Sequence, residues 1–384
     1  MLYYLSEWLY KNFDTPGAGL LNYISVRAAA AIIVSLIISL LLGKSLIKFL
    51  RKKQIGEEIR ELGLQGQIEK KGTPTMGGIL IIASILIPVL LFTKLTNIYI
   101  MLMIFTTLWL GALGFADDYI KVFKKNKEGL PGKTKLIGQI LLGIVVGSIM
   151  YFDSDVVIKE KNSAHNQQII SENVLSLDKE AKTTISYHDI DAKKSTITTI
   201  PFVKDNEFDY SWITQWMGDK SGKWSAIFYI LIITFIIAAV SNGANLTDGL
   251  DGLTSGVSAF VAVGIAILAY VSGNVVFSDY LNIMFIPNIS EIVVYAAAFI
   301  GACIGFYWWN CFPAKIFMGD TGSLAIGGII AVLCVIIRKE FLIPILCGVF
   351  FIETISVIIQ RYYFKYTKKK YGEGKRYFLM APLH

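Results

Sequence analysis

Residues 98–135 read IYIMLMIFTTLWLGALGFADDYIKVFKKNKEGLPGKTK, and this stretch decides the fold class. Its first part, Ile98–Ala116, contains no charged side chain and has the length of a helix that crosses a bilayer core. Two adjacent carboxylates, Asp117 and Asp118, follow at once, and six lysines come before residue 136. The stretch therefore predicts a transmembrane helix that ends at an acidic and then basic boundary.

The rest of the chain repeats this pattern of long apolar blocks. Of its 384 residues, 54% are hydrophobic and 17% are charged, whereas a soluble domain carries about 25% charge. The composition predicts an all-α, polytopic membrane protein, which we treat as one integral membrane domain over residues 1–384. The nine predicted spans are Tyr23–Leu42, Gly77–Phe92, Ile98–Ala116, Leu136–Phe152, Ala226–Val240, Leu253–Val271, Ile292–Trp309, Leu324–Ile337 and Phe341–Ile359.

Lysine and arginine are distributed unevenly between alternate loops. The loop 43–76 has eight of them, 117–135 has six and the tail 361–384 has seven, while the other loops have few. Basic loops face the cytoplasm, so this bias places the N-terminus outside the cytoplasm. The net charge of +7 follows from the same bias and from attraction to anionic membrane lipid, and no nucleic-acid partner is expected.

Residues 153–222 form a polar insert on the predicted outer side. Nine lysines and twelve acidic residues lie between Asp153 and Lys223. Within it, residues 183–203 (TTISYHDIDAKKSTITTIPFV) alternate β-branched and polar residues, which favours a small β-hairpin. The insert carries no catalytic constellation.

The motifs rich in glycine and charge all fall on the predicted cytoplasmic side. Carboxylates near lysines and glycines suit Mg²⁺-assisted work on phosphates, because Mg²⁺ takes few carboxylates and lysine neutralises phosphate. We therefore predict a Mg²⁺ and phosphate centre there. The motifs are KKGTPTMGG (70–78), FADDYIK (115–121), SNGANLTDGLDGLTSG (241–256), NCFPAKIFMGDTGS (310–323) and FLMAPLH (378–384).

Each motif also has a simpler interpretation. Asp117 and Asp118 could cap the membrane end in solvent, and "DGLDG" could be a plain turn; were it helical, Asp248 and Asp251 would share a face. Asp320 could be a helix N-cap. The lysines between 121 and 135 could only obey the positive-inside rule. Joint occurrence on one side of the membrane favours the functional interpretation.

Five motifs, "KKGTPTMGG", "FADDYIK", "NLTDGLDGL", "FMGDTGSL" and "MAPLH", carry a family resemblance. They resemble the phospho-N-acetylmuramoyl-pentapeptide transferase branch of the polyprenyl-phosphate N-acetylhexosamine-1-phosphate transferases, glycosyltransferase family 4. The resemblance covers nearly the whole chain except the insert. It implies an enzyme of the bacterial cytoplasmic (inner) membrane with its site on the cytoplasmic face. The reaction would transfer phospho-N-acetylmuramoyl-pentapeptide from its UDP-activated form (UDP-MurNAc-pentapeptide) to undecaprenyl phosphate. The products would be the first lipid intermediate of peptidoglycan synthesis and uridine monophosphate. A homodimer is the family expectation.

The resemblance also implies roles for individual residues. Asp117 and Asp118 match the acidic pair, with Asp117 as the favoured base, and Asp320 matches the Mg²⁺-binding aspartate. His384 matches the first residue of a catalytic histidine cluster. The matching nucleotide-pocket positions are Lys70, Thr75, Asn245, Asp248, Asp251, Asn310 and Phe317, with Phe317 stacking on uracil. The matching phosphate-side lysines are Lys121, Lys125 and Lys133.

The sequence departs from the family pattern at its C-terminal end. The family motif continues past "APLH" with two more histidines and a tenth span, so we expect this C-terminus to be truncated.

Three alternatives stay open. Transfer of N-acetylglucosamine-1-phosphate to the same lipid is the nearest. A secondary transporter would place its acids at mid-span, unlike these. Direct attack by the lipid phosphate is preferred to a covalent aspartyl-phosphate route, because it needs one displacement only.

Overall fold

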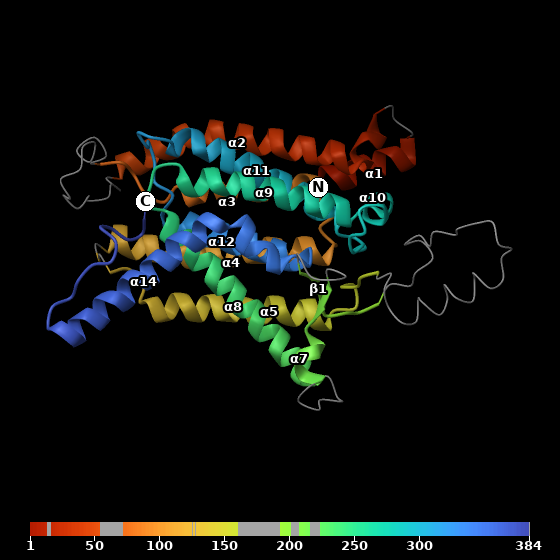
Figure 1. The fold of residues 1–384 in the computed structure, drawn as a ribbon. Coiled ribbons are helices and arrows are strands. Elements are labelled where there is room, and N and C mark those ends of the chain that lie inside the picture. Colours follow the sequence, from red (N-terminus) through yellow and green to blue (C-terminus); the bar gives the residue numbers. More distant parts are fainter. Residues whose placement is uncertain are drawn as a thin grey trace.

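The computed structural model describes residues 1–13, 17–53, 72–124, 126, 128–159, 193–200, 207–215 and 223–383. Most of them lie in long, roughly aligned helices (Figure 1). This confirms the predicted all-α, polytopic membrane class. The long helices are α2 (Ile24–Lys52), α3 (Gly78–Phe92), α4 (Ile98–Phe123), α5 (Gly132–Phe152), α8 (Lys223–Thr247), α9 (Leu253–Ser272), α11 (Ser290–Asn310), α12 (Gly319–Ile336) and α14 (Gly348–Tyr371).

Each predicted span corresponds to helix in the structure, but the helix ends and two of the spans differ from the prediction. Within the described part of the chain, seven helices are long and apolar enough to cross a membrane, and α3, with 15 residues, is shorter. The ninth predicted span is not one straight helix. The 3₁₀ turn η4 (Glu340–Leu342) and α13 (Ile343–Leu346) precede α14, and the two parts meet at a bend of 80°. Figure 1 shows α14 leaning away from the bundle.

The centre of the bundle is formed by α11 and α12, whose apolar windows are 78% and 89% buried. Helix α11 packs against α2, α9 and α3, and α12 packs against α4 and α8. The backbone at the start of α12 lies in close contact with the backbones of α3 and α4. A Cβ added at Gly78 would lie 2.1 Å from the Gly322 nitrogen, and one at Gly114 would lie 2.2 Å from the Asp320 carbonyl oxygen. Glycines in α3 and α4 therefore bring α12 close to both helices.

The short elements lie mostly at the opposite end of the bundle from α14 and the C-terminal segment (Figure 1). Strands β1 and β2 pair antiparallel, with Thr198 opposite Phe208. The insert thus contains an antiparallel strand pair, but β2 lies beyond the segment 183–203 in which the hairpin was predicted. Residues 160–192, 201–206 and 216–222 lie outside the described part of the chain. The short elements are α1 (Leu2–Phe13), η1 (Ala18–Asn22), β1 (Ile197–Thr199), β2 (Glu207–Asp209), α7 (Ser211–Gln215) and α10 (Val275–Tyr280).

The β1–β2 pair is attached to the end of α12. The backbone N–H of Thr199 donates to the Arg338 carbonyl at 3.1 Å, and the Tyr210 hydroxyl donates to Glu340 at 2.9 Å. Arg338 and Lys339, expected in an outer loop, are only 2% and 3% exposed. Burial lowers the pKa of Lys339 to about 8. The insert therefore covers charges that the sequence places in a loop between two spans.

Candidate active site

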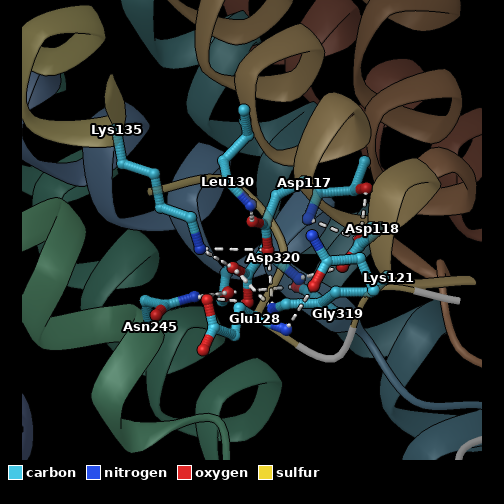
Figure 2. A network of polar contacts seen from close by, with 12 residues as sticks. Asp117, Asp118, Lys121, Glu128, Leu130, Lys135, Asn245, Gly319 and Asp320 are labelled. Atoms are coloured by element: carbon cyan, nitrogen blue, oxygen red, sulfur yellow. Dashed lines mark hydrogen bonds and ion pairs between the residues drawn. The ribbon is translucent and has the colours of Figure 1, made fainter. Parts of the chain in front are cut away.

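Three carboxylates from two helices meet near one end of the bundle (Figure 2). Asp117 and Asp118 lie on α4, and Asp320 lies in the first turn of α12. One oxygen from each lies within 4.8 Å of the others. Helix α4 runs on to Phe123, beyond the apolar block, so both aspartates are helical and buried, at 0% and 3% exposure. The interpretation in which they cap the membrane end in solvent is therefore wrong.

Asp118 holds the start of α12. Its carboxylate accepts hydrogen bonds from the backbone nitrogens of Asp320 at 3.1 Å and Thr321 at 2.9 Å, and from the Thr321 hydroxyl at 2.6 Å. The first N–H groups of a helix have no acceptor within the helix. Here the Asp118 carboxylate, from α4, is the acceptor for two of them. Asp320 makes no N-cap bond of its own, so the N-cap interpretation of Asp320 is wrong.

The turn that enters α12 requires glycine at position 319. Gly319 has φ of +73°, which side chains rarely adopt. A Cβ there would lie 2.6 Å from the Asp118 Oδ2 atom and 3.0 Å from the Thr75 hydroxyl. This approach aims the backbone of α12 at Asp118 and brings Thr75 to the same place.

Two lysines bridge the carboxylates. The Lys121 ammonium lies 2.6 Å from Asp117 Oδ2 and 3.2 Å from Asp320 Oδ2. Lys135, on α5, lies 3.0 Å from Asp117 Oδ2 and also pairs with Asp320 Oδ2. Asp117 and Asp320 thus share two ammonium groups, whereas the donors to Asp118 are uncharged.

The remaining oxygens of Asp117 and Asp320 are held by neutral donors. The Leu130 N–H donates to Asp117 Oδ1 at 2.6 Å. Asn245, on α8, donates to Asp320 Oδ1 at 3.0 Å and to the Ser323 hydroxyl at 2.8 Å. The cluster therefore draws on α4, α5, α8 and α12 and on the loop between α4 and α5.

The donor set fits a divalent cation. Asp117 Oδ2 is fully buried and accepts no hydrogen bond of good geometry from a described residue, so only the two ammonium groups offset its charge. Asp320 Oδ2 lies beside the same ammonium groups. Carboxylate oxygens are the ligands that Mg²⁺ takes in proteins, so Asp117 and Asp320 would hold it. Asp118 is already engaged by three donors.

The other nucleotide-pocket candidates lie in neighbouring turns. Asp248 and Asp251 are in the turn between α8 and α9 and not on one helix, so a shared helical face is ruled out and the turn interpretation holds for the backbone. Asp251 accepts from the Ala314 nitrogen at 3.1 Å, and the buried Asn310 accepts from the Gly252 nitrogen at 3.0 Å. These bonds tie the α8–α9 turn to the segment before α12.

Phe317 belongs to a short backbone pairing beside the cluster. Its N–H donates to the Pro74 carbonyl, and its own carbonyl accepts from Gly77, both at 2.8 Å. The half-buried Phe317 ring is therefore carried by backbone fixed to the segment before α3.

The structure does not bring the remaining predicted candidates to the cluster or does not describe them. Lys133 is exposed and makes no ion pair with a described carboxylate. Lys70, Lys125 and His384 lie outside the described residues, so their roles stay predictions.

Residues 194–338 match glycosyl transferase family 4, and residues 70–82 match phospho-N-acetylmuramoyl-pentapeptide-transferase signature 1. The proteins named phospho-N-acetylmuramoyl-pentapeptide-transferase from Flavobacterium psychrophilum and Parabacteroides distasonis are 57% and 56% identical to this chain. Both alignments cover all of this chain, and 91% and 88% of those proteins. The chain belongs to the phospho-N-acetylmuramoyl-pentapeptide-transferase family. The resemblance inferred from the motifs is thus confirmed.

In this member of the phospho-N-acetylmuramoyl-pentapeptide-transferase family, signature 1 covers the segment that pairs with Phe317 and leads into α3. The signature therefore includes Thr75, whose hydroxyl lies with Asp118 next to Gly319.

Lys135 and Gln139 are site residues that were not predicted from the sequence. Lys135 is one helical turn before the buried Gln139, whereas Lys133 is exposed on another face of α5. Gln139 is fully buried, donates to Ser241 at 3.3 Å and accepts from Asn242 at 2.8 Å. No local pattern separates Lys135 from Lys133, because the buried face of α5 is set by its packing against α8.

Gln139→Leu is expected to lower kcat by about tenfold, because it frees α5 from α8 and lets Lys135 move from the carboxylates. The test measures kcat, KM and melting temperature together. Leu141→Ala, at an exposed position of the same helix, is the control and should stay near the wild-type kcat. A lower melting temperature with unchanged kcat would show that Gln139 only stabilises the fold.

Proposed function

We propose that this protein transfers phospho-N-acetylmuramoyl-pentapeptide from its UDP-activated form to undecaprenyl phosphate, with Mg²⁺ as cofactor. The products are the first lipid intermediate of peptidoglycan synthesis and uridine monophosphate. The observation that carries the proposal is the convergence of Asp117, Asp118 and Asp320 with Lys121 and Lys135. Family membership supports the choice of substrates.

The proposed location is the bacterial cytoplasmic membrane, with the site on the cytoplasmic face. The cluster lies at the end of the bundle near which α2 ends and the C-terminal segment lies, and the adjoining loops are rich in lysine and arginine (Figures 1 and 2). Basic loops stay in the cytoplasm. A soluble nucleotide from the cytosol and a membrane-dissolved lipid phosphate can both reach such a boundary.

In the proposed reaction, an oxygen of the lipid phosphate attacks the sugar-side phosphorus of the donor diphosphate. The bond from that phosphorus to the bridging oxygen breaks, and uridine monophosphate leaves with the electron pair. Lys121 and Lys135 stabilise the phosphate charges, because lysine acts as a point charge on phosphate. Bound Mg²⁺ would neutralise the diphosphate and assist the leaving group.

Asp117 has the smaller share of the chemistry in this proposal. A phosphate monoester has a second pKa near 6 by analogy with phosphoserine, so the lipid nucleophile is largely a dianion at neutral pH. A base then adds little, and Asp117 chiefly holds Lys121 and Lys135 in place. Direct attack is preferred to a covalent route, because it needs one displacement only and the lipid nucleophile is already charged. A phosphorylated aspartate after incubation with nucleotide alone would contradict this.

The decisive test is uridine monophosphate release by purified protein with undecaprenyl phosphate and Mg²⁺. UDP-MurNAc-pentapeptide should give release, and UDP-N-acetylglucosamine should give at most about 1% of that rate, since missing contacts to a built site are strongly discriminating. Faster turnover of the second nucleotide would favour N-acetylglucosamine-1-phosphate transfer. Ion flux without any release would favour the transporter.

A further inference from the structure

A cavity of about 500 Å³ lies between α14 and the segment that follows it, residues 372–383. That segment folds back along the helix and is fixed there. Gln360 accepts hydrogen bonds from the backbone nitrogens of Tyr377 at 3.1 Å and Phe378 at 2.9 Å. The Leu383 nitrogen donates to Glu353 at 2.6 Å. The cavity is therefore walled by two segments in a defined arrangement.

The walls of the cavity are strongly basic. Four cations line it: Arg361, Lys365, Lys368 and Arg376. The first three follow at intervals of four and three residues, so they lie on one face of α14. The fourth comes from the returning segment. None of the four forms an ion pair with a carboxylate of the described chain. The cavity lining thus combines four basic side chains with no carboxylate among the described lining residues.

The cavity lies where α14 changes from apolar to basic surface. Outward-facing Ile352, Ile355 and Ile358 are 58%, 48% and 48% exposed, which suits contact with lipid chains. Tyr362 and Tyr366 follow, 72% and 59% exposed, and aromatic residues of this kind mark the membrane interface. The basic residues of the cavity lie among these tyrosines, because Arg361 and Lys365 directly precede Tyr362 and Tyr366 along the helix. The cavity is therefore at the level of lipid phosphates.

We propose that this cavity binds the headgroup of an anionic phospholipid from the surrounding leaflet. Clusters of lysine and arginine next to a transmembrane helix attract anionic lipid, and here the returning segment adds a wall that a bare helix lacks. Val357 and Phe364 line the same cavity and offer apolar contact to the first methylenes. The lining shares no residue with the acidic cluster, so the cavity is formed by a separate set of side chains.

The test is binding of short-chain phosphatidylglycerol to the purified protein, measured by native mass spectrometry and by the shift in melting temperature. The triple variant Arg361→Ala, Lys365→Ala, Arg376→Ala should bind about 10- to 100-fold more weakly. The matched control is Lys369→Ala, Lys370→Ala, at the same end of α14 but outside the cavity lining, and it should stay within about twofold of wild type. Phosphatidylcholine should bind wild type and triple variant alike.

Three results would overturn the proposal. Equal weakening in the control would mean diffuse surface charge rather than a site. Unchanged phosphatidylglycerol binding in the triple variant, or in the single charge reversal Lys365→Glu, would remove the cavity from lipid binding. Competition by undecaprenyl phosphate at equimolar amounts, together with a raised acceptor KM in the triple variant, would assign the cavity to the acceptor.

Discussion

Asp320→Asn is expected to lower kcat/KM by about 1,000-fold, the largest effect of any single change considered. Asp320 Oδ1 accepts from Asn245, and Oδ2 pairs with Lys121 and Lys135. Asparagine has one acceptor oxygen and one donor NH₂ group in place of the two carboxylate oxygens. Since all partners of Asp320 are donors, the NH₂ group must face either Asn245 or the two ammonium groups, and that partner loses its acceptor. The charge that places both lysines and that would hold Mg²⁺ is lost as well.

The measurement for Asp320→Asn is uridine monophosphate release across a Mg²⁺ titration. The activity that remains should need more Mg²⁺ for half-maximal rate than wild type. Asp155→Asn, an exposed carboxylate just after the far end of α5, is the control and should behave as wild type. Full activity of Asp320→Asn at low Mg²⁺ would remove this residue from the metal site.

Gly319→Ala is expected to lower kcat by about 100-fold, because a displacement of about 1 Å in a site has effects of this size. The alanine Cβ would lie 2.6 Å from Asp118 Oδ2, so the turn, the carboxylate or both must move. Adopting φ of +73° adds about 1–2 kcal/mol of strain. Asp320 is the next residue and would move with the turn.

The control for Gly319→Ala is Gly132→Ala, because a Cβ at Gly132 meets nothing within 4 Å and its φ is not positive. That variant should keep both activity and melting temperature. Kinetic constants and unfolding temperature of both variants are compared side by side. Wild-type kcat in Gly319→Ala would mean that the tight turn does not position the cluster.

Much of the architecture followed from local sequence. An apolar block long enough to cross a bilayer must become helix, because unpaired backbone groups are too unfavourable in lipid. Each predicted span is therefore helical in the structure. Their ends were less predictable, since an apolar block ends at the membrane boundary whereas a helix continues while its hydrogen bonds do. Asp117 and Asp118 consequently lie inside α4, and α14 runs on to Tyr371.

The sequence predicted which residues belong to the candidate site better than which of them contact each other. The acidic motifs on one side of the membrane predicted Asp117, Asp118 and Asp320, and the structure brings these three carboxylates together. Lys133 and Lys135 are two residues apart, and only packing of α5 against α8 decides which of them faces the carboxylates. Asp248 and Asp251 were expected on one face if helical, but the glycines after them lie in a turn.

The sequence by itself determined that the chain is a bundle of membrane helices with acidic and basic groups at one boundary, because hydropathy and the positive-inside rule act residue by residue. Only the tertiary structure decided that Asp118 caps α12, that Lys135 joins Lys121 between Asp117 and Asp320, and that the last predicted span bends at Cys347. Those features depend on contacts between residues up to about two hundred positions apart, such as Asp118 and Thr321, and no local pattern encodes such a contact.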